Sequence, residues 1–238
     1  MITFLGDEYG PLKVFAPPEP DMVYSLGIDA STGLSDDYSC FQVLQNTLPF
    51  EQVAVFRAKM AIAKVTEFAD RLGRWYNEAL ICCEINFPGN SVQDALLQYY
   101  QYPRSYKPEQ HLDEDPSISP KYGFRTTETS KWMLIHELQT VIAERNLKIN
   151  DKTTIYELSN YVYQGSSKKA GGAQGFNDDT VMALMMALHI ARLYPFVLPT
   201  LSASRKRHDS QNADVQHDWK RFRQKLISRT QNKEIEIA

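Results

Sequence analysis

Apolar residues recur along the chain with two different periods, which divide its first part into strands and one helix. Alternation and short apolar runs predict a meander of three strands, followed by a helix and a nearly continuous apolar strand of the kind found at the centre of a sheet. These elements fall at residues 24–29, 38–46, 52–59, 61–77 and 79–85. The order predicts an α/β fold in which helices flank a mixed β-sheet.

The second part of the chain is mainly helical in pattern. A helix is predicted from Ser91, as N-cap, to Tyr99, and a long one over 127–146 with an apolar stripe. The stripe consists of Met133, Leu134, Leu138, Val141 and Ile142. Residues 154–163 predict a short helix, with or without a strand, and 178–193 predict a last helix that Pro195 stops. Between these helices, 99–122 is expected to be a hairpin-like insertion and 165–175 a flexible loop.

Composition is that of a globular protein, with 43% hydrophobic and 23% charged residues among 238. We expect a lead-in at 1–22, one domain at 23–200 and a basic tail at 201–238. Residues 203–238 hold nine Lys or Arg against five Asp or Glu, whereas the remainder carries a net charge of −7. Neither a signal peptide nor a membrane-spanning run is apparent. The three cysteines form no CxxC pair, and are expected to be buried in a reducing compartment.

Four acidic residues stand where strands end or a helix begins. Asp29 and Glu84 each end an apolar strand, and Asp178 and Asp179 open the last helix. Each alone has a structural explanation, as a turn residue, a solvated strand end or a helix cap. Together they are placed to meet at one edge of the sheet, where their oxygens would suit Mg²⁺ or Mn²⁺. Two such ions support phosphodiester cleavage.

The residues around these acids resemble the motifs of one family, the nuclease domain of the large terminase subunit of tailed bacteriophages, which has a ribonuclease H-like fold. The matching segments are Gly27-Ile28-Asp29 with Asp37-Tyr38-Ser39, Glu84-Ile85-Asn86 with Pro88-Gly89, Tyr122 to Thr127, Ile155 to Leu158, and Gly175 to Val181. One departure is Asn177, where many relatives carry His. The resemblance covers roughly residues 23–195.

The resemblance implies that Asp29, Glu84 and Asp178 form a metal-binding catalytic triad that holds Mg²⁺ or Mn²⁺, with two ions expected. Asp179 would be a second ligand, an outer partner or a helix cap. The implied function is endonucleolytic cutting of concatemeric viral double-stranded DNA during genome packaging, in the cytoplasm of the infected bacterium. Implied partners are the terminase ATPase motor, the small terminase subunit and the portal protein. No segment matches a phosphate-binding loop, so the motor is expected elsewhere.

Basic residues are the candidates for contacts with the DNA backbone. They are Lys168, Lys169, Arg104, Lys107 and Arg125. The alternative is a solvated loop for the two lysines and a tyrosine-rich segment packed on its own domain for the others. Two other functions remain open on the sequence: a junction resolvase or transposase of the same fold, and a packaging adaptor that binds DNA or the portal without cutting.

Overall fold

A mixed β-sheet forms the centre of the protein in a computed structural model, which describes residues 10–34, 37–108, 122–164 and 169–196. Its strand order is β1-β4-β3-β2-β5, with β6 beside β4. The strands are β1 (Leu12–Val14), β2 (Tyr24–Asp29), β3 (Ser39–Gln45), β4 (Phe50–Ala58), β5 (Leu80–Cys83) and β6 (Leu147–Lys148). Strands β1 to β4 pair antiparallel, whereas β5 runs parallel to β2 and β6 parallel to β4. This arrangement confirms the predicted ribonuclease H-like α/β class.

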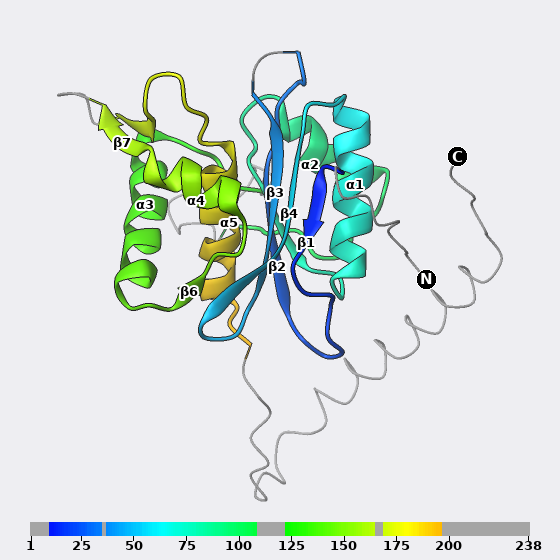
Figure 1. Cartoon of the computed structure of the whole chain (residues 1–238). Coiled ribbons are helices and arrows are strands. Elements are labelled where there is room, and N and C mark those ends of the chain that lie inside the picture. Colours follow the sequence, from blue (N-terminus) through cyan, green and yellow to red (C-terminus); the bar gives the residue numbers. More distant parts are fainter. Residues whose placement is uncertain (1–9, 35–36, 109–121, 165–168, 197–238) are drawn as a thin grey trace, which may run out of the picture. The chain divides into compact units, whose positions relative to one another are not determined.

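Helices cover both faces of the sheet (Figure 1). On one face, α1 (Ile62–Trp75) and α2 (Gly89–Gln98) bury their apolar sides in one core cluster. On the other, α5 (Asp179–Leu193) packs on the sheet and is covered in turn by α3 (Glu128–Ala143) and α4 (Lys152–Ser159). Nearly every α5 residue is buried, as expected of a helix that is apolar all round. A separate hairpin joins β7 (Tyr161–Gln164) to β8 (Lys169–Gly172).

Alternation along β2 decides which residues face α5. Leu26 and Ile28 belong to the core beneath α1 and α2, so Gly27 points to the opposite face. A Cβ atom at Gly27 would lie 2.0 Å from the Ala183 carbonyl oxygen and 2.5 Å from the Ala187 nitrogen. The absence of a side chain at Gly27 therefore lets the α5 backbone pack directly on the strand.

Several predicted elements differ in detail from the structure. Part of the expected lead-in is strand β1, which pairs with β4 at the sheet edge. Helix α2 begins at Gly89 rather than after Ser91, with Pro88 as its N-cap. The expected loop at 165–175 contains strand β8, because its small residues pair with β7. Residues 201–238 and most of the expected insertion lie outside the described residues, and the domain boundaries remain a prediction.

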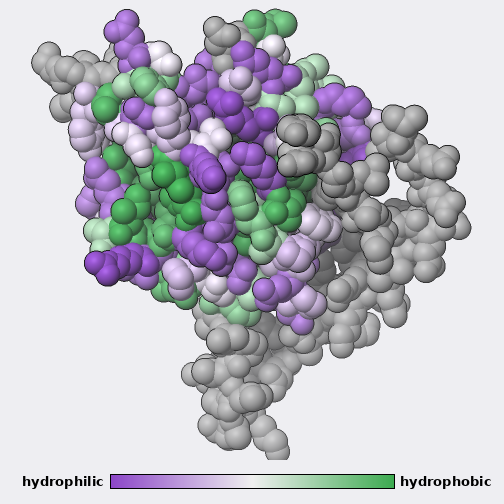
Figure 2. All heavy atoms as spheres, in the orientation of Figure 1, coloured by the Kyte–Doolittle hydropathy of each residue, from purple (hydrophilic) through white to green (hydrophobic). Residues whose placement is uncertain are grey.

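The predicted apolar stripe of α3 is also partly wrong. Met133 and Ile142 are 41% and 43% exposed, because the buried face follows Leu134, Leu138 and Val141 at helical spacing. Figure 2 shows hydrophobic residues gathered at the surface on the side of the molecule where α3 and α4 lie. None of the described helices is long and apolar enough to cross a membrane.

Candidate active site

Two of the predicted acids lie side by side at the ends of the parallel strands β2 and β5. Ile28 pairs with Cys83, and the Glu84 N–H donates to the Ile28 carbonyl at 3.0 Å, so the parallel ladder continues to the next residue. Cys82 belongs to the core beneath α5, and Glu84, two residues on, points to the same face. Asp29 follows Gly27 by two residues and also faces α5. The sheet therefore places both carboxyl groups on one face and at one edge.

The start of α5 reaches the same edge. Gly27 lies against Ala183, and the residues that end α5 lie near Asn46, beside the start of β2. Helix α5 therefore begins beside Asp29 and runs antiparallel to β2. Four helical residues span about 6 Å and two strand residues about 6.6 Å. Asp179 is thus brought level with Asp29. Asp178 occupies the N-cap position, but its side chain makes no capping hydrogen bond. Its carboxylate is available for other contacts.

The other three acids lie close enough to Asp29 for their charges to affect its pKa. Burial raises the pKa of Asp29 well above its usual range, and the negative charge of Glu84 is the next contribution. The charges of Asp179 and Asp178 raise the pKa further, as does a hydrogen bond with the Glu84 carboxyl group. Side chains from three distant parts of the chain therefore form one cluster of negative charge.

Asp179 is more buried than its neighbour Asp178, since only 9% of its surface is exposed. Its Oδ2 accepts hydrogen bonds from the Tyr38 backbone N–H at 3.1 Å and from the Asn177 Nδ2 at 3.2 Å. Burial raises the pKa of Asp179 to about 6, although these two donors partly oppose the rise and Glu157 adds to it. Asn177, the departure from the family pattern, therefore acts here as a donor to the acid two residues on.

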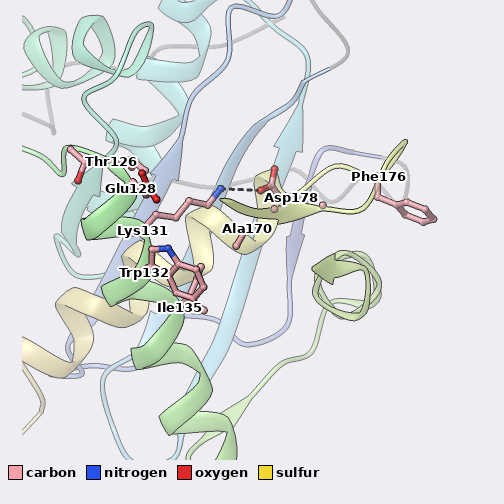
Figure 3. A pocket seen from close by; sticks show the side chains of 11 residues that line it. Thr126, Glu128, Lys131, Trp132, Ile135, Ala170, Phe176 and Asp178 are labelled. Atoms are coloured by element: carbon pink, nitrogen blue, oxygen red, sulfur yellow. Dashed lines mark hydrogen bonds and ion pairs between the residues drawn. The ribbon is translucent and has the colours of Figure 1, made fainter. Parts of the chain in front are cut away.

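Lys131 of α3 supplies a cation to the cluster, and the sequence alone did not indicate it. Its Nζ lies 3.4 Å from the Asp178 Oδ2, and the two side chains are 25% and 29% exposed (Figure 3). They are 47 residues apart, and no spacing rule connects positions on two helices that meet only in the fold. The pair places one positive charge directly beside the acids.

Glu84 has a fixed neighbour in Asn86. The Asn86 Nδ2 donates to the Glu84 Oε1 at 3.0 Å and to the Thr126 carbonyl at 2.8 Å. Glu84 also forms an isolated bridge with Phe124, just before the start of α3. Asn86 therefore orients the carboxylate and ties it to the segment that leads into α3.

A fifth acid, Glu157, lies buried behind the cluster on α4. Its Oε2 accepts hydrogen bonds from the Thr180 backbone N–H, at 2.9 Å, and from the Thr180 hydroxyl. Its other oxygen pairs with Arg57 at 3.3 Å, and the Arg57 guanidinium stacks 3.4 Å from the centre of the Tyr38 ring. Glu157 therefore fixes the first turn of α5, on which Asp179 stands. The family motif contained this residue, but its role required the fold.

The predicted DNA contacts are not all near the acids. Arg125 follows the bridge to Glu84 and is exposed at the acidic edge, whereas Arg104 bonds to the Glu78 carbonyl before the start of β5, at the opposite end. Lys107 is exposed, with its Nζ 6.0 Å from the centre of the Tyr122 ring. Lys168 lies outside the described residues, as does the side chain of Lys169 in β8.

The side chains as they stand do not enclose a single point for an ion. In the part of the chain that the structure describes, no group of three His, Cys, Asp or Glu residues is arranged to hold a metal. Three of the four acids have other partners. Asp178 contacts Lys131, Asp179 accepts from Tyr38, and Glu84 accepts from Asn86. The roles of the acids as ligands therefore remain a prediction.

A sheet with this strand order, helices on both faces and acids at one edge defines a ribonuclease H-like domain. Residues 26–190 match the family described as the terminase RNaseH-like domain, and the chain belongs to this family.

Solved structures of phage terminase nucleases are similar to this fold. The large terminase nuclease of the thermophilic phage G20c aligns with a TM-score of 0.59 and 22% identity, over 77% of this chain and 90% of that one. The same nuclease with bound magnesium gives 0.60 and 21%, over 77% and 89%. The nuclease domain of Thermus phage P74-26 gives 0.58 and 20%, over 76% and 86%. At these identities the likeness establishes the fold.

Proposed function

We propose that this protein is a metal-dependent endonuclease that cuts concatemeric viral double-stranded DNA during genome packaging. The observation that carries the proposal is the convergence of three other carboxyl groups on Asp29 at one edge of the sheet, in a chain of the terminase RNaseH-like family. Buried like charges are unfavourable unless a cation or proton compensates them. A cluster of this kind is therefore more useful for binding cations than for stabilising the fold.

The donor set fits Mg²⁺ or Mn²⁺, since both ions prefer hard oxygen ligands. Asp29, Glu84 and Asp178 would hold the metal, two ions being expected, and Asp179 would join them or support them from behind. The similar G20c nuclease binds magnesium, cobalt and zinc in solved structures, which supports a divalent site here. Bound ions would supply the positive charge that favours attack on a phosphodiester and stabilises the departing oxygen.

The protein's own contribution is to hold its acids rigidly where the DNA backbone arrives. Asp29 and Glu84 stand on adjacent paired strands, and Asn86 fixes the Glu84 carboxylate. Asp178 stands at the start of a buried helix that packs on the sheet. Sites built on such elements keep their geometry better than sites on loops. Lys131, beside Asp178, can compensate negative charge on an approaching phosphate.

The proposal includes the setting in which the reaction occurs. Partners would be double-stranded DNA, the terminase ATPase motor, the small terminase subunit and the portal protein, in the cytoplasm of the infected bacterium. Contacts mainly to phosphates imply little sequence preference. Arg125 would contribute from the acidic edge, and Lys168 and Lys169 from the β7–β8 hairpin. The basic residues at 201–238 would form a separate tail that contacts DNA or a packaging partner.

A plasmid-nicking assay with Mg²⁺ or Mn²⁺ tests the activity. The parent is expected to convert supercoiled plasmid to nicked and linear forms, and Asp29→Asn or Asp178→Asn to slow this by at least a hundredfold. Asp94→Asn, an exposed acid on α2, is the matched control and should cut like the parent. Equal cutting by Asp29→Asn would refute the assignment. A parent that binds DNA but never cuts it would favour the packaging adaptor.

A further inference from the structure

A cavity of about 490 Å³ lies between the first turns of α3 and the strand β8. Asp178 forms part of its wall, so the cavity borders the acid cluster directly (Figure 3). Cavities of about 300–1,000 Å³ are the size that holds small-molecule ligands in proteins. The cavity lies on the α3 side of the acid cluster. Asp179 and Glu84 are not among the residues that line it.

Lys131 makes the cavity suitable for a phosphate. Its ammonium group lines the space and contacts Asp178 at 3.4 Å, a longer separation than the roughly 2.7–2.9 Å of a firm charge-assisted hydrogen bond. The side chain is largely withdrawn from water, so its charge is poorly screened, yet its flexible stem allows it to shift toward another anion. Glu128, the other acid in the lining, is exposed at the first turn of α3, where water screens it.

The remaining walls are aromatic or small. Trp132 is stacked on Tyr163, with ring centres 5.0 Å apart and planes within 10°, which holds its ring rigidly in the wall. Phe176 also lines the cavity, but its ring points away from the α3 side chains (Figure 3) and lies 5.7 Å from the Tyr156 ring, centre to centre. Gly171 and Gly172 of β8 also line the cavity. Aromatic rings contact sugars and bases without regard to sequence.

We propose that this cavity is a nucleotide subsite: it binds one nucleotide of the DNA strand next to the bond that is cut. Lys131 binds the phosphate of that nucleotide, and Trp132 contacts its sugar or base. The inference rests on the proposed nuclease function and adds the place where the strand is held. The subsite is expected to show little base preference, because its proposed contacts go to the phosphate and to the face of the sugar or base.

Titration of the full chain with thymidine 5′-monophosphate in EDTA tests the subsite without any cleavage. The indole N–H resonance of Trp132, identified among the chain's three tryptophans by its loss in Trp132→Leu, should shift and saturate. Inorganic phosphate should bind at least tenfold more weakly than the nucleotide. Lys131→Met should weaken nucleotide binding at least tenfold. Lys64→Met, which removes an exposed lysine paired with Glu67 on α1, should bind like the parent.

Three results would overturn the subsite: no shift at Trp132, equal affinity for inorganic phosphate, or parent-like nucleotide binding by Lys131→Met. A second measurement follows DNA cleavage in Mn²⁺, where Lys131→Met should raise KM about tenfold and change kcat less. If Asp29→Asn cuts like the parent while the nucleotide still binds, the nuclease assignment fails and the nucleotide site stands. If Asp29→Asn is inactive but Lys131→Met matches the parent in KM and in nucleotide binding, the subsite alone fails.

Discussion

Replacement of Asp179 by Asn is expected to stabilise the metal-free protein at pH 8. Burial raises the pKa of Asp179 from 3.8 to about 6, which the N–H of Tyr38 only partly offsets, and Glu157 adds to the rise. A carboxyl group whose pKa is higher in the folded state binds more protons when folded. Its contribution to stability is therefore lost as the pH rises from about 4 to about 6. The rise corresponds to up to about 3 kcal/mol at pH 8.

Asparagine removes this penalty and keeps an oxygen that can accept the Tyr38 N–H. Urea unfolding in EDTA should show the variant more stable than the parent by up to about 3 kcal/mol at pH 8 and by about 1 kcal/mol at pH 4.5. Asp94→Asn, on the exposed side of α2, should change stability little at either pH. A variant that is less stable than the parent at pH 8, or whose advantage is the same at both pH values, would show that Asp179 is not strained by its surroundings.

Three further changes test other parts of the site. Gly27→Ala should lower the free energy of unfolding in urea by about 1–3 kcal/mol and reduce cleavage. The new Cβ would lie 2.0 Å from the Ala183 oxygen and push α5 away from β2. Unchanged stability would contradict this packing. Glu157→Gln should lower stability by about 1–3 kcal/mol, because the charged acceptor for Thr180 is lost. Thermal and urea unfolding measure this change. Unchanged stability would show that Glu157 does not anchor the first turn of α5. Mn²⁺ at about 100 times its dissociation constant should stabilise the parent by about 2.7 kcal/mol in a thermal scan and Asp29→Asn far less; equal stabilisation would place the ion elsewhere.

Local sequence patterns were sufficient for most of the framework. The apolar run before Asp29 predicted β2 with the bounds observed, and the opposite orientation of Cys82 and Cys83 follows from strand alternation. The failures lie where pairing partners are distant. Strand β1 sits in a proline-rich segment and forms only because β4 offers it an edge. Strand β8 is composed of small residues that read as a loop until β7 is placed beside it.

In the candidate site, too, some features could be predicted from local sequence and others could not. Strand ends and a helix start are local features, so the positions of the acids could be found before the fold was known. The contacts that orient them could not, because Lys131 reaches Asp178 from another helix and Glu157 reaches Thr180 across 23 residues. Such contacts depend on how α3, α4 and α5 pack, and the periodicity of apolar residues does not predict that packing. The cavity beside Asp178 likewise depends on how α3 lies against β8 and the start of α5, which the sequence alone did not reveal.

The fold holds its acids together against their mutual repulsion, and the packing around Gly27 explains how it does so. Because α5 contacts β2 backbone to backbone, its first turn cannot withdraw from Asp29 without opening the buried core on that face of the sheet. The apolar contacts along α5 thus oppose the separation that the charges favour. Asp29 responds with a raised pKa rather than with a displaced side chain. A bound divalent cation would relieve the same repulsion, so stability in the absence of metal and affinity for metal should change in opposite directions when any one of the four acids is neutralised.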